Sequence, residues 1–153
     1  MTYFAPDPTP EQIENGIARH YDPDDRGGLM PYYGLAPDDT LAAACVIHDE
    51  LYLEGGPRDL GAQVDRNFER DCLLLALSVD CPLGKAFELG KAELFSGVVY
   101  LVGPKLWRKD SRNTEVTRAQ GLKFVNEAKR HINACAIAQG KPLPYPEVKL
   151  SLA

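Results

Sequence analysis

The segment covering residues 58–79 constrains the fold more than any other part of the sequence. Within it, Val64, Phe68, Cys72 and Leu75 recur at intervals of three and four residues, which predicts a helix with one apolar face. The second half of the segment reads CLLLAL and is apolar on all sides. A helix of that kind must be buried, so the chain must supply further elements to cover it.

Helix-capping residues and helix breakers predict these further elements. Thr9 and Pro10 suit the start of one helix, and Asp38 or Asp39 suits the start of another that ends before Gly55. The predicted helices cover residues 10–21, 38–54, 58–79, 82–101 and 114–139, with the fourth broken near Gly103-Pro104. No alternating strand pattern competes with them, so the predicted fold class is all-α.

A chain of 153 residues most simply forms one domain, here residues 1–153. We expect its core to span about residues 22–107, followed by the C-terminal helix at about 114–139 and an extended, proline-containing tail at 140–153. Residues 22–39 read DPDDRGGLMPYYGLAPDD and hold three prolines and three glycines, which predicts a long loop. Loops of that length without secondary structure tend to be functional.

Charge and hydropathy exclude two classes of function. The formal net charge of −5 argues against a surface that binds nucleic acid phosphates. The longest apolar run, LFSGVVYLVG, is too short to cross a bilayer. The N-terminus has neither the basic nor the apolar region of a secretory signal, so we expect a protein that is cytoplasmic as synthesised. Export by a signal-independent route, or delivery by a phage or a secretion system, remains open.

The segment ACVIHDELY, residues 44–52, carries the main chemical signal. On a helix Cys45, His48 and Tyr52 share one face, and Asp49 lies about 100° round from His48. His48 can therefore meet a water molecule while Asp49 points toward a metal near the preceding loop. A buried imidazole needs a partner for its second ring nitrogen, and Asp65 on the next helix is the candidate.

The cysteines allow a link between the same two helices. If those helices run antiparallel, Cys45 and Cys72 are carried toward the same end, so a disulfide between them is geometrically conceivable. We expect this bridge only if the protein works outside a reducing compartment. It would hold His48 and Asp65 in register.

These segments resemble the secreted phospholipase A2 superfamily. Its motif C-x-x-H-D-x-x-Y is matched at residues 45–52, and VDRNFERDC at residues 64–72 is similar to the second helix of the small bacterial and fungal branch. The resemblance implies an all-α fold in which two antiparallel helices carry the active site. A long metal-binding loop precedes them, and additional packed helices follow.

The resemblance also implies a function: calcium-dependent hydrolysis of a carboxylic ester of a phospholipid. It assigns the general base to His48, the orientation of that base to Asp65, and a helix-bridging hydroxyl to Tyr52. It assigns calcium binding to Asp49, with the remaining ligands from the loop, where Asp25 is the nearest match by spacing and Asp24 and Asp22 are rivals. The implied substrate is a phospholipid or membrane surface, and delivery machinery or an inhibitor protein are conceivable partners.

Three other readings remain open at this point. His48 and Asp49 could be a hydrogen-bonded core histidine and a solvated aspartate. A metal-dependent phosphohydrolase with an H…HD…D signature would use His20 together with His48 and Asp49, but it would give no role to Tyr52 or Asp65. The chain could also be a non-catalytic, phospholipase-like scaffold, such as a virion, toxin or immunity component.

Overall fold

The computed structural model describes residues 40–111, 113 and 115–148. This part of the chain contains four helices and no strand, which confirms the all-α prediction. The helices are α3 (Ala42–Glu54), α4 (Arg58–Leu77), α5 (Pro82–Leu106) and α6 (Glu115–Ala138). The helix expected at residues 10–21 and the loop expected at 22–39 lie outside the described residues.

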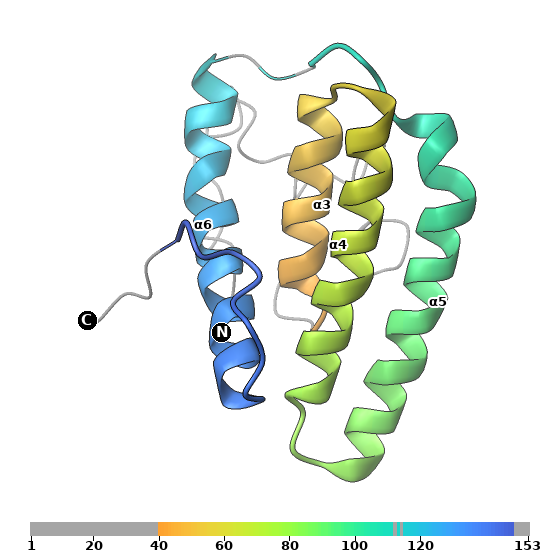
Figure 1. Cartoon of the computed structure of the whole chain (residues 1–153), viewed down its shortest axis with the longest axis vertical. Coiled ribbons are helices and arrows are strands. Elements are labelled where there is room, and N and C mark those ends of the chain that lie inside the picture. Colours follow the sequence, from red (N-terminus) through yellow and green to blue (C-terminus); the bar gives the residue numbers. More distant parts are fainter. Residues whose placement is uncertain (1–39, 112, 114, 149–153) are drawn as a thin grey trace, which may run out of the picture.

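The four helices lie roughly along one direction, with α3 and α4 between the other two (Figure 1). The chain turns after α3, and α4 runs back beside it. Helix α6 packs against α3, whereas α5 packs against α4. None of the described helices is long and apolar enough to cross a lipid bilayer.

Helix α3 is enclosed by its neighbours. All of its residues except Leu51, Leu53 and Glu54 are buried. This explains why the faces of α3 differ little in hydrophobicity, since a helix surrounded by others needs no polar side. Its apolar residues share one core with side chains from the other three helices, among them Phe68, Leu75, Phe95, Val99, Phe124 and Ile132.

The same core contains Cys45 and Cys72, which are both completely buried. No disulfide joins them in the structure. The register of α3 and α4 therefore rests on packing and on hydrogen bonds between their polar side chains. The conditional bridge expected from the spacing of these cysteines is not formed.

The ends of α3 differ in how well the sequence predicts them. The helix begins at Ala42, later than the predicted start at residue 38 or 39, and Leu41 at its N-terminus provides no side-chain cap. It ends as predicted before Gly55, whose φ of 67° suits glycine. A Cβ at Gly55 would also collide with the backbone carbonyl oxygen of Arg108.

The predicted break in the fourth helix is wrong. Helix α5 continues through Gly103 and Pro104 to Leu106. Proline lacks one N–H and crowds the preceding turn, yet the helix resumes beyond it, because the N–H of Trp107 donates to the carbonyl oxygen of Gly103 at 2.9 Å. Two residues of helix after the proline are enough to carry Trp107 back toward α3 and α4.

The C-terminal segment after α6 is anchored at Tyr145, whose side chain is buried. The amide nitrogen of Asn133 donates to the carbonyl oxygen of Tyr145 at 2.7 Å, and the N–H of Tyr145 donates to Asn133 Oδ1 at 3.0 Å. The Tyr145 hydroxyl donates to Asp71 on α4. Tyr145 thus ties the predicted tail to the helices, while residues 140–143, 146 and 147 around it are exposed.

Candidate active site

His48 and Asp65 meet between α3 and α4. Nε2 of His48 lies 3.0 Å from Oδ1 of Asp65, and both side chains are almost completely buried. The sequence interpretation requires a ring nitrogen of His48 within about 3.2 Å of this carboxylate, and the observed distance satisfies that requirement. Residues 17 positions apart in the chain are thus brought into direct contact.

Tyr52 joins the pair one helical turn after His48. Its hydroxyl donates to the same oxygen, Asp65 Oδ1, at 2.6 Å. Burial and then the Asp65 carboxylate raise the pKa of Tyr52 well above its usual value of 10. The phenol therefore keeps its proton and acts as a permanent hydrogen-bond donor to Asp65.

The hydrogen bonds fix the chemical state of the imidazole. A carboxylate can only accept, so Nε2 of His48 must carry the proton that it shares with Asp65 Oδ1. In the neutral ring the lone pair then resides on Nδ1. Nδ1 is buried and has no hydrogen-bond partner among the described residues. A buried nitrogen with an unused lone pair is suited to accept a proton from a small polar molecule.

Asp49 provides a second carboxylate near this nitrogen. Its Oδ1 lies 3.9 Å from Nδ1 of His48, which is too long for a hydrogen bond but close enough for electrostatic interaction. Burial, the largest single influence, lowers the pKa of His48, but the combined effect of Asp49 and Asp65 outweighs it. The pKa of His48 is therefore raised above its usual value of 6.5.

Aromatic rings hold the imidazole in place. The ring centroid of His48 lies 4.4 Å from that of Tyr52 and 4.7 Å from that of Phe68. Trp107, after α5, meets Tyr52 edge-on at 4.9 Å and donates its indole N–H to the carbonyl oxygen of Gly56 at 2.9 Å. These contacts tie α3, α4 and the end of α5 together around the polar cluster.

Gly103 is a site residue that the sequence interpretation missed. A Cβ at this position would collide with the Tyr52 hydroxyl and would lie 2.8 Å from Oδ2 of Asp65. Only glycine lets the backbone of α5 come so close to these two polar groups. In the sequence, Gly103-Pro104 signals a helix end, and nothing in that signal points to Asp65.

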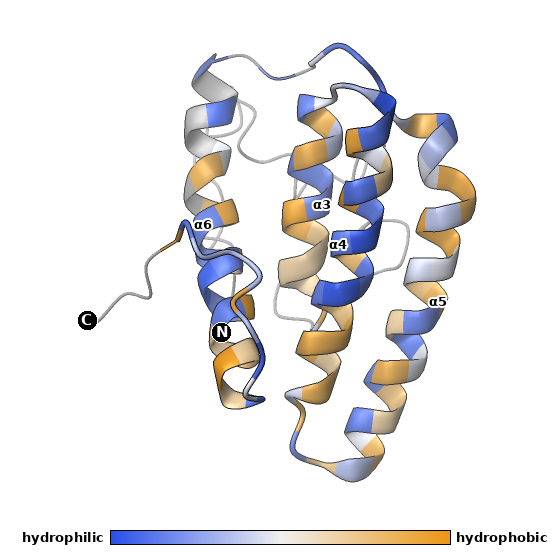
Figure 2. Cartoon of the chain, viewed as in Figure 1, coloured by the Kyte–Doolittle hydropathy of each residue, from blue (hydrophilic) through white to orange (hydrophobic). Residues whose placement is uncertain are grey.

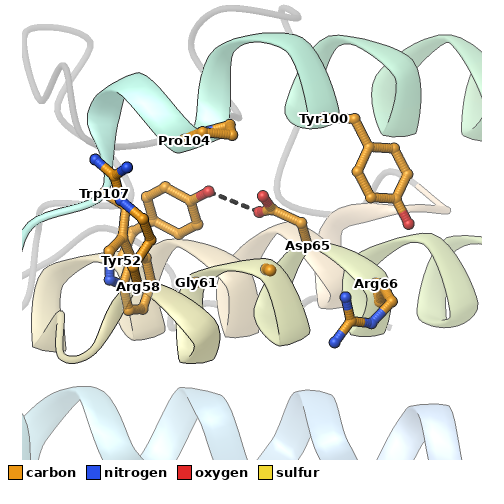
Figure 3. A pocket seen from close by; sticks show the side chains of 9 residues that line it. Tyr52, Arg58, Gly61, Asp65, Arg66, Tyr100, Pro104 and Trp107 are labelled. Atoms are coloured by element: carbon orange, nitrogen blue, oxygen red, sulfur yellow. Dashed lines mark hydrogen bonds between the residues drawn. The ribbon is translucent and has the colours of Figure 1, made fainter.

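A pocket opens on the α5 side of the same carboxylate (Figure 3). It has a volume of about 320 Å³ and lies between α4 and α5. Figure 3 shows the Tyr52 hydroxyl directed at Asp65, with Pro104 and Tyr100 contributed by α5. The lining residues do not include His48, so this pocket does not lead to Nδ1.

Asp49 is the described residue to which the phospholipase resemblance assigns calcium. Its carboxylate supplies the hard oxygen atoms that calcium prefers, and it is buried close to the proposed base. Among the described residues, no group of three or more His, Cys, Asp or Glu side chains is arranged to hold a metal ion. Calcium takes six to eight oxygen ligands, so the others would come from the segment before α3. That segment includes Asp25 and lies outside the described residues.

The structure therefore brings together His48, Asp49, Tyr52 and Asp65 from α3 and α4. His20, which the phosphohydrolase reading requires, lies outside the described residues, as does Asp25. Comparison of the chain with protein-family models, with curated proteins and with solved structures finds no match.

Proposed function

We propose that the protein is a calcium-dependent hydrolase similar to phospholipase A2, which cleaves a carboxylic ester of a phospholipid. The observation that carries the proposal is the state of His48. Asp65 holds the proton on Nε2, and Nδ1 is left buried, without a hydrogen-bond partner among the described residues, beside the carboxylate of Asp49. This is the arrangement that a base needs in order to activate a water molecule.

In the proposed reaction one side chain transfers the proton and two others support it. Nδ1 of His48 accepts a proton from water as the water oxygen attacks the ester carbonyl carbon. The Asp65 carboxylate stabilises the imidazolium that forms, and the Tyr52 hydroxyl holds that carboxylate in place. His48 then returns the proton to the departing alcohol oxygen. When bound at Asp49, calcium supplies a Lewis acid that polarises the ester carbonyl.

The bonding of Asp65 favours this function over the phosphohydrolase. The phosphohydrolase reading gives Asp65 and Tyr52 no role, whereas Oδ1 of Asp65 accepts from both His48 and Tyr52. A scaffold protein would need none of these bonds. The state of Nδ1 separates the dyad from a hydrogen-bonded core histidine, because a buried ring nitrogen without a partner among the described residues costs stability.

The test is direct measurement of hydrolysis. The protein is incubated with mixed phosphatidylcholine and phosphatidylglycerol vesicles, with calcium or with a chelator, and released fatty acid and lysolipid are identified by mass spectrometry. We expect calcium-dependent release by the wild type and none by His48→Gln. His131→Gln, which changes a half-buried histidine on α6, should leave release unchanged. Equal release by wild type and His48→Gln would refute the proposal.

A further inference from the structure

Helix α5 has an apolar face that nothing in the described part of the chain covers. Its large side chains Leu83, Phe87, Leu94 and Leu101 are 83%, 67%, 62% and 77% exposed. Apolar positions recur along the whole helix, which lies at the edge of the molecule and packs mainly on α4 (Figures 1 and 2). Monomeric soluble proteins rarely leave so continuous an apolar surface in water.

The exposed face follows the spacing of a coiled-coil seam. Leu83, Phe87, Gly90, Leu94, Gly97 and Leu101 succeed one another at intervals of four, three, four, three and four residues. We call these six positions the outer stripe. A different set, Ala92, Phe95, Ser96 and Val99, is buried toward the bundle. The outer stripe is therefore additional to the face that packs on α4, and its period is the one that pairs two helices.

The two glycines of the outer stripe are open hollows. A Cβ added at Gly90 or Gly97 would meet nothing within 4 Å, so the fold of one copy does not require glycine there. Glycine in a helix interior costs about 0.5–1 kcal/mol relative to alanine. Two such residues on an exposed apolar stripe indicate that another surface approaches the helix closely at these positions.

The order of large and small residues makes the outer stripe complementary to itself. In two antiparallel copies of α5 crossing at the level of residue 92, residues whose numbers add up to 184 lie opposite each other. Phe87 then faces Gly97 of the second copy, and Leu94 faces Gly90 of the second copy. Leu83 faces Leu101 of the second copy. Every glycine hollow thus receives a large side chain, as in knobs-into-holes packing.

We propose that the protein forms a homodimer in which the outer stripes of two α5 helices pack antiparallel. The area is sufficient: with about 200 Å² per side chain and the exposed fractions given above, the four large residues of both copies would together remove roughly 1,200 Å² from water, the lower end for stable interfaces. The charge of Lys91, beside the stripe, is already neutralised within one copy. Lys91 pairs with Glu88 at 3.0 Å and lies over the Phe87 ring, so the stripe itself offers an apolar surface.

The first experiment measures the association of the full chain by sedimentation equilibrium at micromolar and higher concentrations. We expect the wild type to be a dimer and Leu94→Glu to be a monomer with unchanged helical circular dichroism. The matched control is Leu122→Glu on α6, which changes a leucine that is 53% exposed and should leave the dimer intact. A wild type that is monomeric at every concentration overturns the proposal.

The second experiment tests the antiparallel register. In Gly90→Leu the added Cβ meets nothing within 4 Å in its own copy, so the change should keep or raise helix stability but weaken dimerisation by at least about tenfold. The double variant Gly90→Leu with Leu94→Gly exchanges the large and small members of one layer and should restore the dimer. If Gly90→Leu associates as well as the wild type, the proposed packing is wrong.

A lipid surface is the alternative occupant of the outer stripe. In that case the wild type would sediment as a monomer and bind vesicles of phosphatidylcholine and phosphatidylglycerol, and Leu94→Glu would abolish that binding. This outcome overturns the homodimer. Dimerisation that disappears in Leu94→Glu and returns in the exchanged double variant supports it, whether or not the protein hydrolyses lipid.

Discussion

At the scale of single residues, one oxygen atom organises the candidate site. Oδ1 of Asp65 accepts from Nε2 of His48 at 3.0 Å and from the Tyr52 hydroxyl at 2.6 Å. Because both donors lie on α3, their hydrogen bonds to this carboxylate on α4 help to fix the register of the two helices. Because the acceptor cannot donate, it also determines which nitrogen of His48 carries the lone pair.

The first prediction concerns the charge of this carboxylate. Asp65→Asn keeps the shape of the side chain but lets its amide donate, which disturbs the tautomer of His48 and removes support from the imidazolium. The rate of ester hydrolysis should fall by at least about tenfold, while the calcium concentration needed for half-maximal activity changes by only a few-fold. Asp59→Asn, an exposed position on the same helix, should behave as the wild type. A fully active Asp65→Asn would contradict the assigned role.

The pH dependence of the same variant gives a second prediction. His48 acts as a base only when neutral, so activity should rise with pH as its proton is lost. Burial lowers the pKa of His48, and the carboxylates of Asp49 and Asp65 raise it above 6.5. Removing one negative charge lowers that pKa, so the acidic limb of the kcat/KM profile should move to lower pH in Asp65→Asn. A limb that stays in place would mean that another group controls it.

At the scale of elements, the site depends on how closely α5 approaches α3 and α4. Gly103 touches the Tyr52 hydroxyl and the Asp65 carboxylate from the α5 side. At Gly61 on α4, similarly, a Cβ would lie 2.6 Å from the Trp107 ring. Two glycines on different helices thus create the room in which the aromatic and acidic side chains meet, and the pocket of Figure 3 lies beside them.

The third prediction follows from this approach. Gly103→Ala should displace the Tyr52 hydroxyl or push α5 outward, lowering stability by about 1–3 kcal/mol and reducing the rate of hydrolysis. The free energy of unfolding can be measured by urea denaturation. Gly97→Ala is the matched control on the same helix, because its Cβ would meet nothing within 4 Å. At protein concentrations too low for dimers to form, Gly97→Ala should leave the free energy of unfolding unchanged or raise it slightly.

A second substitution tests the cause of that loss. Tyr52→Phe removes the hydroxyl that the new methyl group would strike. In the Gly103→Ala background it should therefore cost less stability than it does in the wild type. If the two losses of stability simply add, a clash with the Tyr52 hydroxyl is not the reason that Gly103→Ala destabilises the protein.

At the scale of the whole molecule, the sequence predicts the parts that follow from local periodicity. The all-α class and the shared face of His48 and Tyr52 on one helix both come from three- and four-residue spacing. The path of α5 through Pro104 and the contact of Gly103 with Asp65 come from packing between distant segments, which spacing does not encode. Tyr145 stands alone in a proline-containing stretch, so no pattern indicated that it would be buried.

That buried tyrosine links the C-terminal segment to the helices. Asp71 on α4 is 1% exposed, accepts from the Tyr145 hydroxyl and pairs with Arg70 at 2.9 Å. Burial raises the pKa of Asp71 to about 6, although Arg70, Tyr145 and Lys129 each lower it. Since the folded pKa exceeds the usual 3.8, ionisation of Asp71 reduces stability as the pH rises through about 6.

The last prediction is that Tyr145→Phe destabilises the protein more at pH 8 than at pH 5. The hydroxyl favours the ionised carboxylate, so its loss raises the folded pKa of Asp71 further and costs about 1–3 kcal/mol where Asp71 is charged. Below the folded pKa the acid is neutral and the cost is smaller. Urea denaturation at both pH values measures the difference, with Tyr100→Phe, a tyrosine that is 42% exposed, as control. Hydrogen exchange of residues 141–148 should accelerate at pH 8 in Tyr145→Phe alone. Equal destabilisation at the two pH values would show that the tyrosine ring, and not its bond to Asp71, anchors the segment.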